Sequence, residues 1–257
     1  MVAQPQSIFV TGAASGIGRA TAALFAERGW LVGAADRDAA GLQTFAETAP
    51  GRIVPFLLDV TDRESVRAAI GTFGETTGGS LDCLLSNAGI DAKGAFGDMA
   101  WERVRALVEV NLLGAMSVIH AALPLLRATP GALCLSTASA SAIFGVGGMA
   151  VYSATKHAVR GLTEALSVEL AGFGVRAADL LPGIIDTGML AAEDKANLPL
   201  TGMWRVIPPA VVAEAAWNAY HGDRLHWFVP PELAELDRQS TAAPEAMRDA
   251  HIAGQIV

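Results

Sequence analysis

Cysteine, tyrosine and charged residues are all scarce in this sequence. Only two of its 257 residues are cysteines, Cys83 and Cys134, which excludes a disulfide framework. Each lies in an apolar run, which favours a buried thiol in a reducing compartment over a redox or metal role. Charged residues make up 17% of the chain, below the usual ~25%, which favours a homo-oligomer that hides part of its surface. With 26 acids against 18 bases, the net charge of −8 argues against nucleic acid or an anionic membrane as a partner.

Uninterrupted hydrophobic runs are also missing. The first ten residues lack the basic and apolar segments of a signal peptide. The most apolar long stretch, residues 104–126, is interrupted by Arg105, Glu109, Asn111, Ser117 and His120, and falls short of the ~20 apolar residues of a membrane span. Three other histidines, His221, His226 and His251, show no metal-ligand spacing, so no metal is expected. We therefore expect a cytoplasmic protein that does not cross a membrane.

The apolar content of 52% is high enough to bury a core, and its pattern alternates between strands and helices. Strands are expected at residues 7–10, 30–35, 52–58, 81–86, 132–137, 175–181 and 225–229. Helices are expected at residues 16–28, 38–48, 61–76, 101–126, 150–171 and 209–220, the third opened by a capping box at Thr61. This order predicts an α/β fold: a single Rossmann-type, doubly wound parallel sheet with helices on both faces, formed by one domain over residues 1–257. Ligands of such sheets bind beyond the carboxyl ends of the strands.

A glycine-rich loop follows the first expected strand and opens the first helix. It contains Gly12, Ser15, Gly16, Ile17 and Gly18 in a G-x-x-x-G-x-G spacing. Glycines allow a tight turn and close approach of a pyrophosphate, and the helix N-terminus offers N–H donors to its charge. The alternative is an ordinary glycine-rich turn, but the strand–loop–helix context favours a dinucleotide site.

Asp36 ends the second expected strand, 18 residues after Gly18. An acid at this place accepts hydrogen bonds from a ribose hydroxyl and repels a 2′-phosphate, which favours NAD over NADP. Arg37 is a counter-argument, because an arginine there could pair with the 2′-phosphate, and Arg19 could assist it. An acid without a ligand role remains the other interpretation of Asp36.

Tyr152 and Lys156 open the second long expected helix and share one of its faces, since they are four residues apart. A tyrosine hydroxyl has a pKa near ~10, too high for a general base at neutral pH. A lysine cation beside it favours the phenolate, as an oxidised nicotinamide would. Ser139 lies 13 residues before Tyr152, just beyond an expected strand, where its hydroxyl can hold a substrate oxygen.

Together these motifs resemble the typical short-chain dehydrogenases/reductases over roughly residues 5–190. Further positions match the family in order: the adenine-site acid Asp59 with Val60, the Asn87-Ala88-Gly89 motif, the active-site Asn111, and the nicotinamide-side loop with Pro182, Gly183, Ile185 and Thr187. Taken alone, Asp59 could belong to a helix entry, Asn87 to a turn, and Asn111 could be a satisfied helix-interior residue.

The resemblance implies roles for these residues. Tyr152 would be the general acid/base, and Ser139 would orient and polarise the substrate oxygen. Lys156 would bind the cofactor ribose and lower the pKa of Tyr152, and Asn111 would hold a water for proton relay. The Ile185 backbone and the Thr187 side chain would fix the nicotinamide carboxamide.

The resemblance ends after Thr187. In the family, the stretch that corresponds to residues 188–208 is a substrate lid, here read as a loop with a short helical piece. Apolar lid residues, Met189 and Trp204, either line an apolar pocket or anchor the lid. Ser141 and Phe144, near Ser139, are candidate pocket walls beside Ser139 and Tyr152. No cationic cluster marks an anionic substrate, so a medium-sized, apolar secondary alcohol or ketone is expected.

The C-terminal sequence also departs from the family. Residues 231–257 resemble one or two amphipathic helices that cover a neighbour or the pocket. The departure weakens the expectation of the family's usual tetramer contact and leaves tetramer and dimer open.

Three functions follow from these observations. The first is an NAD-dependent oxidoreductase that interconverts a secondary alcohol and a ketone. The second is an NADPH-dependent carbonyl reductase, against which Asp36 argues. The third is a non-catalytic dinucleotide-binding sensor, which should lack part of the set Asn111, Ser139, Tyr152 and Lys156.

Overall fold

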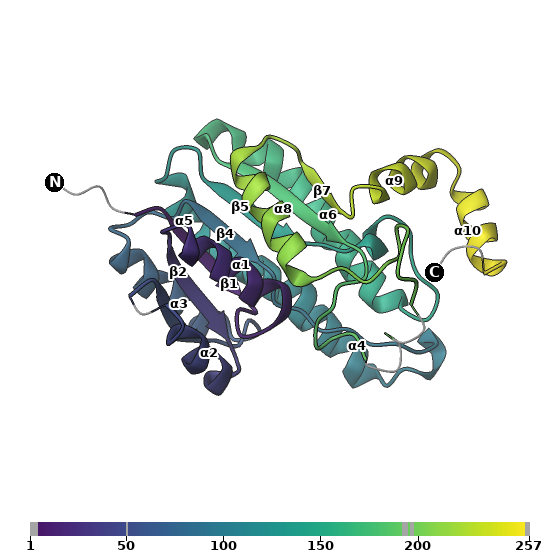
Figure 1. Ribbon diagram of the computed structural model, residues 1–257, viewed down its shortest axis with the longest axis horizontal. Coiled ribbons are helices and arrows are strands. Elements are labelled where there is room, and N and C mark those ends of the chain that lie inside the picture. The colour runs from purple at the N-terminus through teal and green to yellow at the C-terminus, as the bar shows by residue number, and fades with distance from the viewer. Residues whose placement is uncertain (1–4, 50, 192–194, 196–197, 255–257) are drawn as a thin grey trace.

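Seven parallel strands form one sheet in the computed structural model, in the order β3-β2-β1-β4-β5-β6-β7 (Figure 1). The structure describes residues 5–49, 51–191, 195 and 198–254. The strands are β1 (Ser7–Thr11), β2 (Leu31–Asp36), β3 (Ile53–Leu57), β4 (Cys83–Ser86), β5 (Leu133–Thr137), β6 (Arg176–Pro182) and β7 (His226–Val229). The strand order changes direction between β1 and β4, and ligands of doubly wound sheets bind at the carboxyl ends of the strands at such a point.

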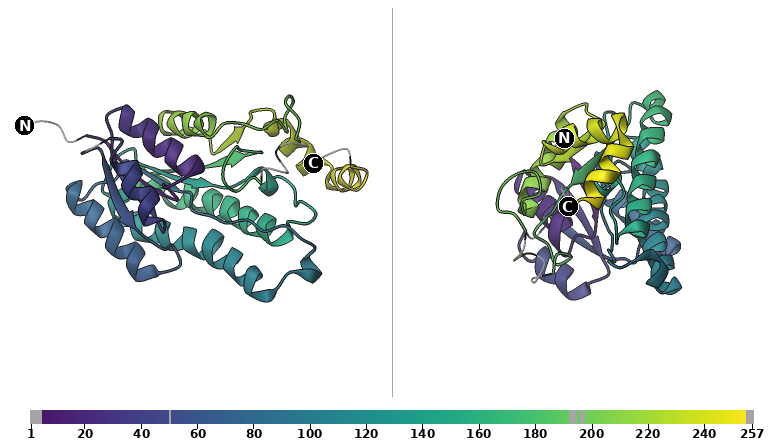
Figure 2. Two further views of the ribbon diagram at one scale, coloured as in Figure 1. Left: turned by 60° about the horizontal axis from the view of Figure 1, so that its bottom comes forward. Right: turned by 90° about the vertical axis from the view of Figure 1, so that its right-hand side faces the viewer.

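Helices cover both faces of the sheet, so the expected doubly wound α/β fold is confirmed (Figure 2). The α1 (Gly16–Glu27), α2 (Ala39–Ala46) and α8 (Pro209–His221) helices pack on one face. The α3 (Arg63–Thr76), α5 (Ala115–Arg127) and α6 (Ala150–Glu169) helices pack on the other. Short helical turns lie at η1 (Phe96–Asp98), η3 (Ala140–Ala142) and η4 (Ala171–Phe173).

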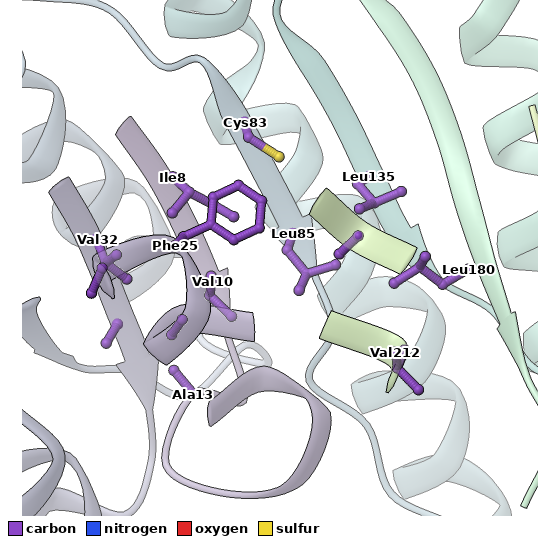
Figure 3. Close-up of a cluster of buried hydrophobic side chains, with 14 of the residues drawn as sticks. Ile8, Val10, Ala13, Phe25, Val32, Cys83, Leu85, Leu135, Leu180 and Val212 are labelled. Atoms are coloured by element: carbon purple, nitrogen blue, oxygen red, sulfur yellow. The ribbon is translucent and has the colours of Figure 1, made fainter. Parts of the chain in front are cut away.

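Strand β1 shows why the strands are apolar on both sides. Ile8 and Val10 point into the core beneath α1 and α8, where Phe25 of α1 and Val212 of α8 meet them (Figure 3). Phe9, between them, points into the opposite core. Successive strand residues face opposite sides, so a strand buried on both faces shows no polar alternation.

Two expected boundaries are wrong for local reasons. Strand β4 begins at Cys83 rather than at residue 81, because the Leu81 N–H donates to Thr129 Oγ1, 2.8 Å away. Helix α3 is capped by Asp62, not by Thr61. The Asp62 carboxylate accepts hydrogen bonds from the Glu64 and Ser65 N–H groups at 3.0 and 3.2 Å.

The expected long helix at residues 101–126 contains a π-helical turn. Helix α4 (Trp101–Val108) runs into this turn, η2 (Glu109–Gly114), and continues as α5. The side chains of Asn111 and Val60 pack at this turn: Asn111 is buried in it, and Val60 comes so close that a Cβ at Gly114 would lie only 2.7 Å from Val60 Cγ2. Such turns are frequent at functional sites, and hydrophobic periodicity does not predict them.

The same segment, Trp101–Arg127, is by length and composition apolar enough to cross a membrane, with a mean hydropathy of 1.7. The expectation that its polar residues exclude a span on composition alone is therefore wrong. Its residues Val118, Ile119, Ala122 and Leu126 are nevertheless buried in the core against the sheet. This packing is that of a core helix in an α/β fold.

Two helices follow the sheet, α9 (Leu233–Ala242) and α10 (Pro244–Ile252), shown in yellow in Figure 1. Leu233, Leu236 and Met247 of these helices are buried in a third cluster with Ala142 and Ile143, which follow β5. The helices thus cover a loop of their own chain. Of residues 188–208, where a loop with a short helical piece is expected, the structure describes residues 188–191, 195 and 198–208, and Lys195 is helical.

Candidate active site

The glycine-rich loop is compact enough to require its glycines. Gly12 and Gly16 have φ angles of +71° and +52°, a region that side chains disfavour. A Cβ at Gly18 would lie 2.1 Å from the Gly12 carbonyl oxygen. Ser15 is the N-cap of α1, and its side chain makes no capping hydrogen bond. The first N–H groups of α1, where Ile17 lies, are thus left to an anion such as a pyrophosphate, and the loop fits a dinucleotide.

Asn87 fastens this loop to two other strand ends. Its side-chain amide donates to the Thr11 carbonyl and accepts from Thr137 Oγ1, both at 3.0 Å. The Thr11 hydroxyl in turn accepts from the N–H groups of Asn87 and Ala88 at 3.0 and 3.1 Å. The ends of β1, β4 and β5 are therefore held together at one point, and Asn87 is more than a turn former.

Asp36 closes over the glycine-rich loop from the end of β2. Its carboxylate accepts hydrogen bonds from Ala14 N–H at 3.0 Å and from Asp38 N–H at 3.1 Å. Each carboxylate oxygen retains a second lone pair for a ribose hydroxyl. Arg37 is exposed beside it. Arg19 lies over the Phe45 ring, 5.0 Å from its centroid, and donates to the Ala14 carbonyl.

Asp59 closes the turn that leads into α3. The N–H and hydroxyl groups of Thr61 donate to its carboxylate at 2.9 and 2.7 Å, and these bonds lower the pKa of Asp59. The nearby Arg37 lowers it further. Helix entry is thus one real role of Asp59, and the exposed carboxylate keeps further acceptor sites. Val60, next to it, is buried against the π-helical turn.

Ser139 and Tyr152 meet at the carboxyl end of β5. Ser139 caps η3, where its hydroxyl oxygen accepts from Ser141 N–H at 3.1 Å. Burial raises the pKa of Tyr152 to about 12, the hydrogen bond with Ser139 lowers it, and the charge of Asp91 raises it. The phenol is therefore protonated at neutral pH in the chain by itself.

Lys156 lies behind this pair and is buried. Its Nζ donates to the Thr137 carbonyl at 2.8 Å and lies 5.7 Å from the centroid of the Tyr152 ring. Burial lowers the pKa of Lys156 to about 8. In the chain by itself, burial of the phenol outweighs the groups that favour the phenolate, so the pKa of Tyr152 lies above its ordinary value. That Lys156 lowers this pKa when the cofactor is bound stays a prediction.

Asn111 points from the π-helical turn toward the same place. Its amide oxygen accepts from Ile90 N–H, and its nitrogen donates to the Ile90 carbonyl, both at 2.8 Å. The nitrogen also donates to Thr155 Oγ1 at 3.3 Å, so both amide protons are used. Asn111 Oδ1 and Lys156 Nζ would lie 3.2 and 3.7 Å from a Cβ at Gly89. The Asn87-Ala88-Gly89 segment and the catalytic candidates therefore share one small volume.

The loop after β6 returns to the glycine-rich loop. Pro182 ends β6, and Gly183 N–H donates to the Val229 carbonyl at 2.7 Å. Ile185 is buried and pairs with Ile207 in an isolated bridge. Thr187 Cγ2 would lie 3.0 Å from a Cβ at Gly16. The nicotinamide-side candidates thus lie against the phosphate-side candidates.

The substrate candidates are only partly brought together. Phe144 and Trp204 are half-buried against the third cluster, beside Ser139's own loop. Ser141 is buried, and its hydroxyl has no hydrogen-bond partner among the described residues. Met189 is 45% exposed and does not belong to that cluster.

Comparison with known families decides the assignment. A sequence profile described as short chain dehydrogenase matches residues 6–198. The chain is a short-chain dehydrogenase. The resemblance found in the motifs is therefore confirmed at the level of the family. The expectation of an oxidoreductase with a small-molecule substrate is confirmed with it.

Relatives of this short-chain dehydrogenase act on different substrates. It is 35% identical to 3-oxoacyl-[acyl-carrier-protein] reductase FabG of Thermotoga maritima over 183 residues, 70% of this chain and 74% of the relative. It is 30% identical to cyclohexanol dehydrogenase of Acinetobacter sp. over 210 residues, 80% of this chain and 83% of the relative. A crystal structure of 3-ketoacyl-(acyl-carrier-protein) reductase from Brucella melitensis, complexed with NADH, is similar at a TM-score of 0.80 and 28% identity, and the match covers 88% of this chain and 97% of that one. A nicotinamide dinucleotide is therefore the expected cofactor of this short-chain dehydrogenase.

Sequence reasoning missed two features of this short-chain dehydrogenase. Lys93, Asp98 and Arg103 line a surface cavity of about 440 Å³, near the Asp91 whose charge reaches Tyr152. No cationic cluster is visible in the sequence there, because Lys93 and Arg103 are ten residues apart and come together only through the loop after β4. The second feature is the polar network around Arg160. The one hint of it in the sequence is that Arg160 follows Lys156 by one helical turn and so lies on the same face of the helix.

Proposed function

We propose that this short-chain dehydrogenase is an NAD-dependent oxidoreductase that interconverts an apolar secondary alcohol and its ketone. The observation that carries the proposal is that the Ser139 hydroxyl lies close enough to the buried Tyr152 phenol to lower its pKa, with buried Lys156 behind the two side chains. When bound, the nicotinamide supplies or accepts the hydride at the substrate carbon. The chain itself must hold the substrate oxygen and move its proton.

Tyr152 is the proton donor in the reducing direction. Its phenol is protonated at neutral pH, because burial raises its pKa to about 12, and it gives its proton to the developing alkoxide. Ser139 donates its one hydroxyl proton to the same substrate oxygen and so orients it. Lys156 is mostly charged below its pKa of about 8, so it stabilises the phenolate that remains. Asn111 lies close to Lys156 and would hold the water through which the phenolate regains its proton. In the oxidising direction the same groups act in reverse.

The preference for NAD rests on Asp36. Its carboxylate lies at the end of β2 and accepts from the glycine-rich loop, where a 2′-phosphate would meet its negative charge. Asp59, Val60 and the Asn87-Ala88-Gly89 segment would hold the adenosine half, while Ile185 and Thr187 would hold the carboxamide.

An apolar substrate is supported by the third cluster. Phe144, Met203 and Trp204 are half-buried around the loop that carries Ser139. The cyclohexanol dehydrogenase among the relatives acts on a substrate of this kind. Residues 188–208 would close over it as a lid.

The test follows the absorbance of reduced nicotinamide with the purified chain. Cyclohexanol and other secondary alcohols are offered with NAD and NADP side by side, and cyclohexanone with NADH and NADPH. We expect turnover with NAD and NADH, and at least tenfold less with the phosphorylated cofactors. Tight NAD binding without turnover on any member of the panel would instead favour a dinucleotide-binding sensor.

A second candidate is an NADPH-dependent carbonyl reductase. It is supported by Arg37, which is exposed beside Asp36. Among the described residues, the Asp36 carboxylate accepts hydrogen bonds from Ala14 and Asp38 and not from Arg37, so the guanidinium is left to pair with a 2′-phosphate. The reductase among the relatives also acts on a carbonyl group. Faster turnover with NADPH than with NADH in the same assay would decide for it.

We also propose a cytoplasmic homo-oligomer, a dimer or tetramer. Large apolar side chains are exposed along α4, α5 and α6 and in the turns beside them: Trp101, Leu113, Met116, Val168 and Phe173. Both cysteines are buried free thiols, which suits a reducing compartment. Light scattering after size exclusion tests the oligomer, and a Met116→Glu variant should shift it toward the monomer.

A further inference from the structure

The loop that carries Ser139 is held from outside at three successive residues. Arg160 Nη1 donates to the Ala142 carbonyl at 3.2 Å, and Ser240 Oγ donates to the Ile143 carbonyl at 3.0 Å. The His251 ring stacks on Phe144, with 5.1 Å between ring centroids and 27° between planes. Ala142 and Ile143 are buried and end the short η3 helix, whose last carbonyls have no partner within the helix. Donors from outside the loop are therefore needed there.

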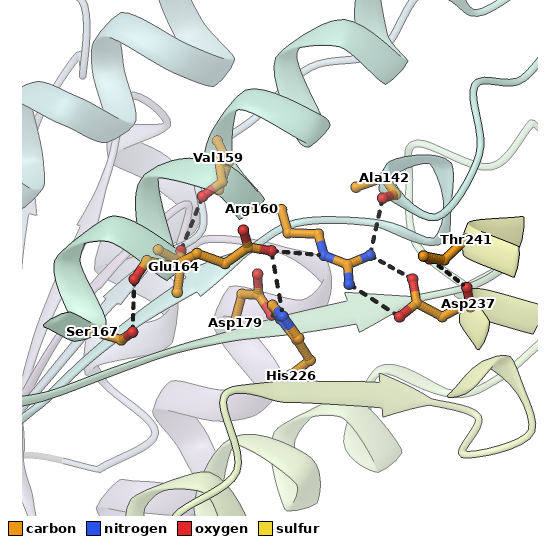
Figure 4. Close-up of polar contacts among 10 residues, drawn as sticks. Ala142, Val159, Arg160, Glu164, Ser167, Asp179, His226, Asp237 and Thr241 are labelled. Carbon is orange, nitrogen blue, oxygen red and sulfur yellow. Dashed lines mark hydrogen bonds and ion pairs between the residues drawn. The ribbon is translucent and has the colours of Figure 1, made fainter. Parts of the chain in front are cut away.

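Two of these three contacts come directly from the C-terminal helices, and the third depends on them. Ser240 belongs to α9 and His251 to α10. Arg160 belongs to α6, but its guanidinium forms a two-pronged pair with Asp237 of α9, at 2.6 and 3.0 Å (Figure 4). The two side chains are 17% and 19% exposed, so water screens this pair little.

The other side of Arg160 is tied to the sheet. Its Nε donates to Glu164 at 3.3 Å, and the same Glu164 oxygen lies 3.5 Å from His226 Nε2. His226 Nδ1 lies 2.8 Å from the fully buried Asp179 of β6. Figure 4 shows the chain of contacts from the interior of β6 through Arg160 to α9. Arg160 is therefore fixed in place before it reaches the Ala142 carbonyl.

We infer that Arg160 is a positioning residue, which, together with Asp237 and Ser240, fixes Ser139 against Tyr152 by holding the end of η3. The inference rests on the proposed function for its kinetic consequences, but its structural consequence is independent of any substrate. Ser139 caps the N-terminus of η3, and Ala142 ends it. A shift at Ala142 therefore moves the Ser139 hydroxyl away from the phenol. The C-terminal helices thereby act on the reaction without touching the reacting atoms.

The first measurement is hydrogen exchange of the full chain, read by mass spectrometry. In Asp237→Asn and in Ser240→Ala, we expect amides of residues 139–144 to exchange at least tenfold faster, while residues 11–19 of the glycine-rich loop stay unchanged. Glu235→Gln is the matched control, since Glu235 lies on the exposed side of α9 and, within the described part of the chain, pairs with Arg238 and Gln239 alone. Unchanged exchange at residues 139–144 in both variants would overturn the inference. Ser240→Ala removes one hydroxyl and keeps the measurement decisive if the other variant unfolds.

The second measurement is steady-state oxidation of cyclohexanol with NAD. We expect kcat to fall about tenfold in Arg160→Gln, with NAD affinity unchanged and with the pH profile of kcat displaced to higher pH. Arg160→Lys should recover part of kcat, because it keeps the charge toward Asp237. A loss of kcat with an unmoved pH profile and an equal loss in NAD affinity would mean a general structural defect and would contradict positioning. If the wild-type chain oxidises no member of the alcohol panel, the proposed function fails, and the exchange measurement alone decides the inference.

Discussion

The ammonium group of Lys156 donates to the carbonyl of Thr137 at 2.8 Å, inside the protein and beside the ring of Tyr152. This one contact fixes a cation at the carboxyl end of β5, where the sheet, the glycine-rich loop and the Ser139 loop meet. It also places that cation where burial lowers its pKa to about 8, close to the pH at which an enzyme works. Stability and activity should therefore respond to Lys156 in opposite ways.

The Lys156→Met variant should be inactive and yet more stable at neutral pH. The pKa of Lys156 lies at about 8 instead of 10.5, which amounts to a cost on the order of 3 kcal/mol for burying the charge. Methionine removes this cost, but ~1 kcal/mol of the stability gained is lost again because the Thr137 carbonyl loses its hydrogen-bond donor. We expect thermal unfolding at pH 7 to move a few degrees upward and turnover to fall at least about 100-fold.

The sign of this effect also depends on pH. The folded state binds fewer protons than the unfolded state between about pH 8 and 10.5, so wild-type stability gains relative to the variant as pH rises through that window. Denaturant titrations at both ends of the window measure the difference. A variant less stable than the wild type at pH 7 would contradict the assignment of Lys156 as a buried charge.

Ketone reduction should be nearly flat from about pH 6 to about pH 8 and fall at higher pH. Tyr152, with a pKa raised to about 12, can donate its proton throughout this range, whereas Lys156 loses its charge above a pKa of about 8. Initial rates with NADH across this range test the profile. Lys156→Arg keeps the charge and should extend the plateau to higher pH. A rate that rises above pH 8 in the wild type would speak against a protonated phenol as donor.

The Tyr152→Phe variant should lose about 10²–10⁴-fold in turnover, the usual range for a general acid or base. NAD affinity should change little, because the variant leaves the glycine-rich loop, Asp36, Asp59, Asn87 and Thr187 unchanged. Isothermal titration with NAD and the absorbance assay separate the two quantities. Near-normal turnover would mean that another group moves the proton.

The Asp36→Asn variant should raise turnover with NADP relative to NAD by about tenfold, because it removes the negative charge that a 2′-phosphate meets. Asp38→Asn is the matched control. Asp38 lies two residues away and caps α2 by accepting from Gly41 N–H at 3.0 Å, a role that asparagine can keep. An unchanged cofactor ratio in Asp36→Asn would remove Asp36 as the selector.

The Gly18→Ala variant should fold poorly or lose NAD binding, since its Cβ would lie 2.1 Å from the Gly12 carbonyl oxygen. Gly161→Ala is the control in the exposed part of α6, where nothing lies within 4 Å of the new Cβ. The control should stabilise the chain by up to ~1 kcal/mol, because alanine favours a helix. Thermal unfolding with and without NAD measures both.

The fold was predictable because both faces of the sheet are covered, so each strand is a short apolar run and each helix has its own period. The glycine-rich loop, Asp36 and the Ser139, Tyr152 and Lys156 set were visible for a related reason: each lies at a strand end or helix start that the pattern already located. The π-helical turn at Asn111 was not visible. Its cause is a set of tertiary contacts, with Ile90 and with Val60, and those contacts have no periodicity.

The network around Arg160 escaped sequence reasoning for a similar reason. Asp179, His226 and Asp237 lie on different elements, and each alone is an ordinary charged or polar residue. The raised pKa of Tyr152 in the chain by itself was not visible either, because charge partners can be read from spacing, whereas the depth of burial cannot.

The α9 and α10 helices, which pack on the Ser139 loop, are synthesised after the sheet and the dinucleotide site. Every strand, the glycine-rich loop and Tyr152 leave the ribosome before Leu233, whereas Ser240 and His251 follow last. A nascent chain can therefore acquire its nucleotide pocket before the end of η3 is secured. Exchange of this short segment during evolution would likewise alter which substrate is accepted while the sheet and its dinucleotide site remain as they are.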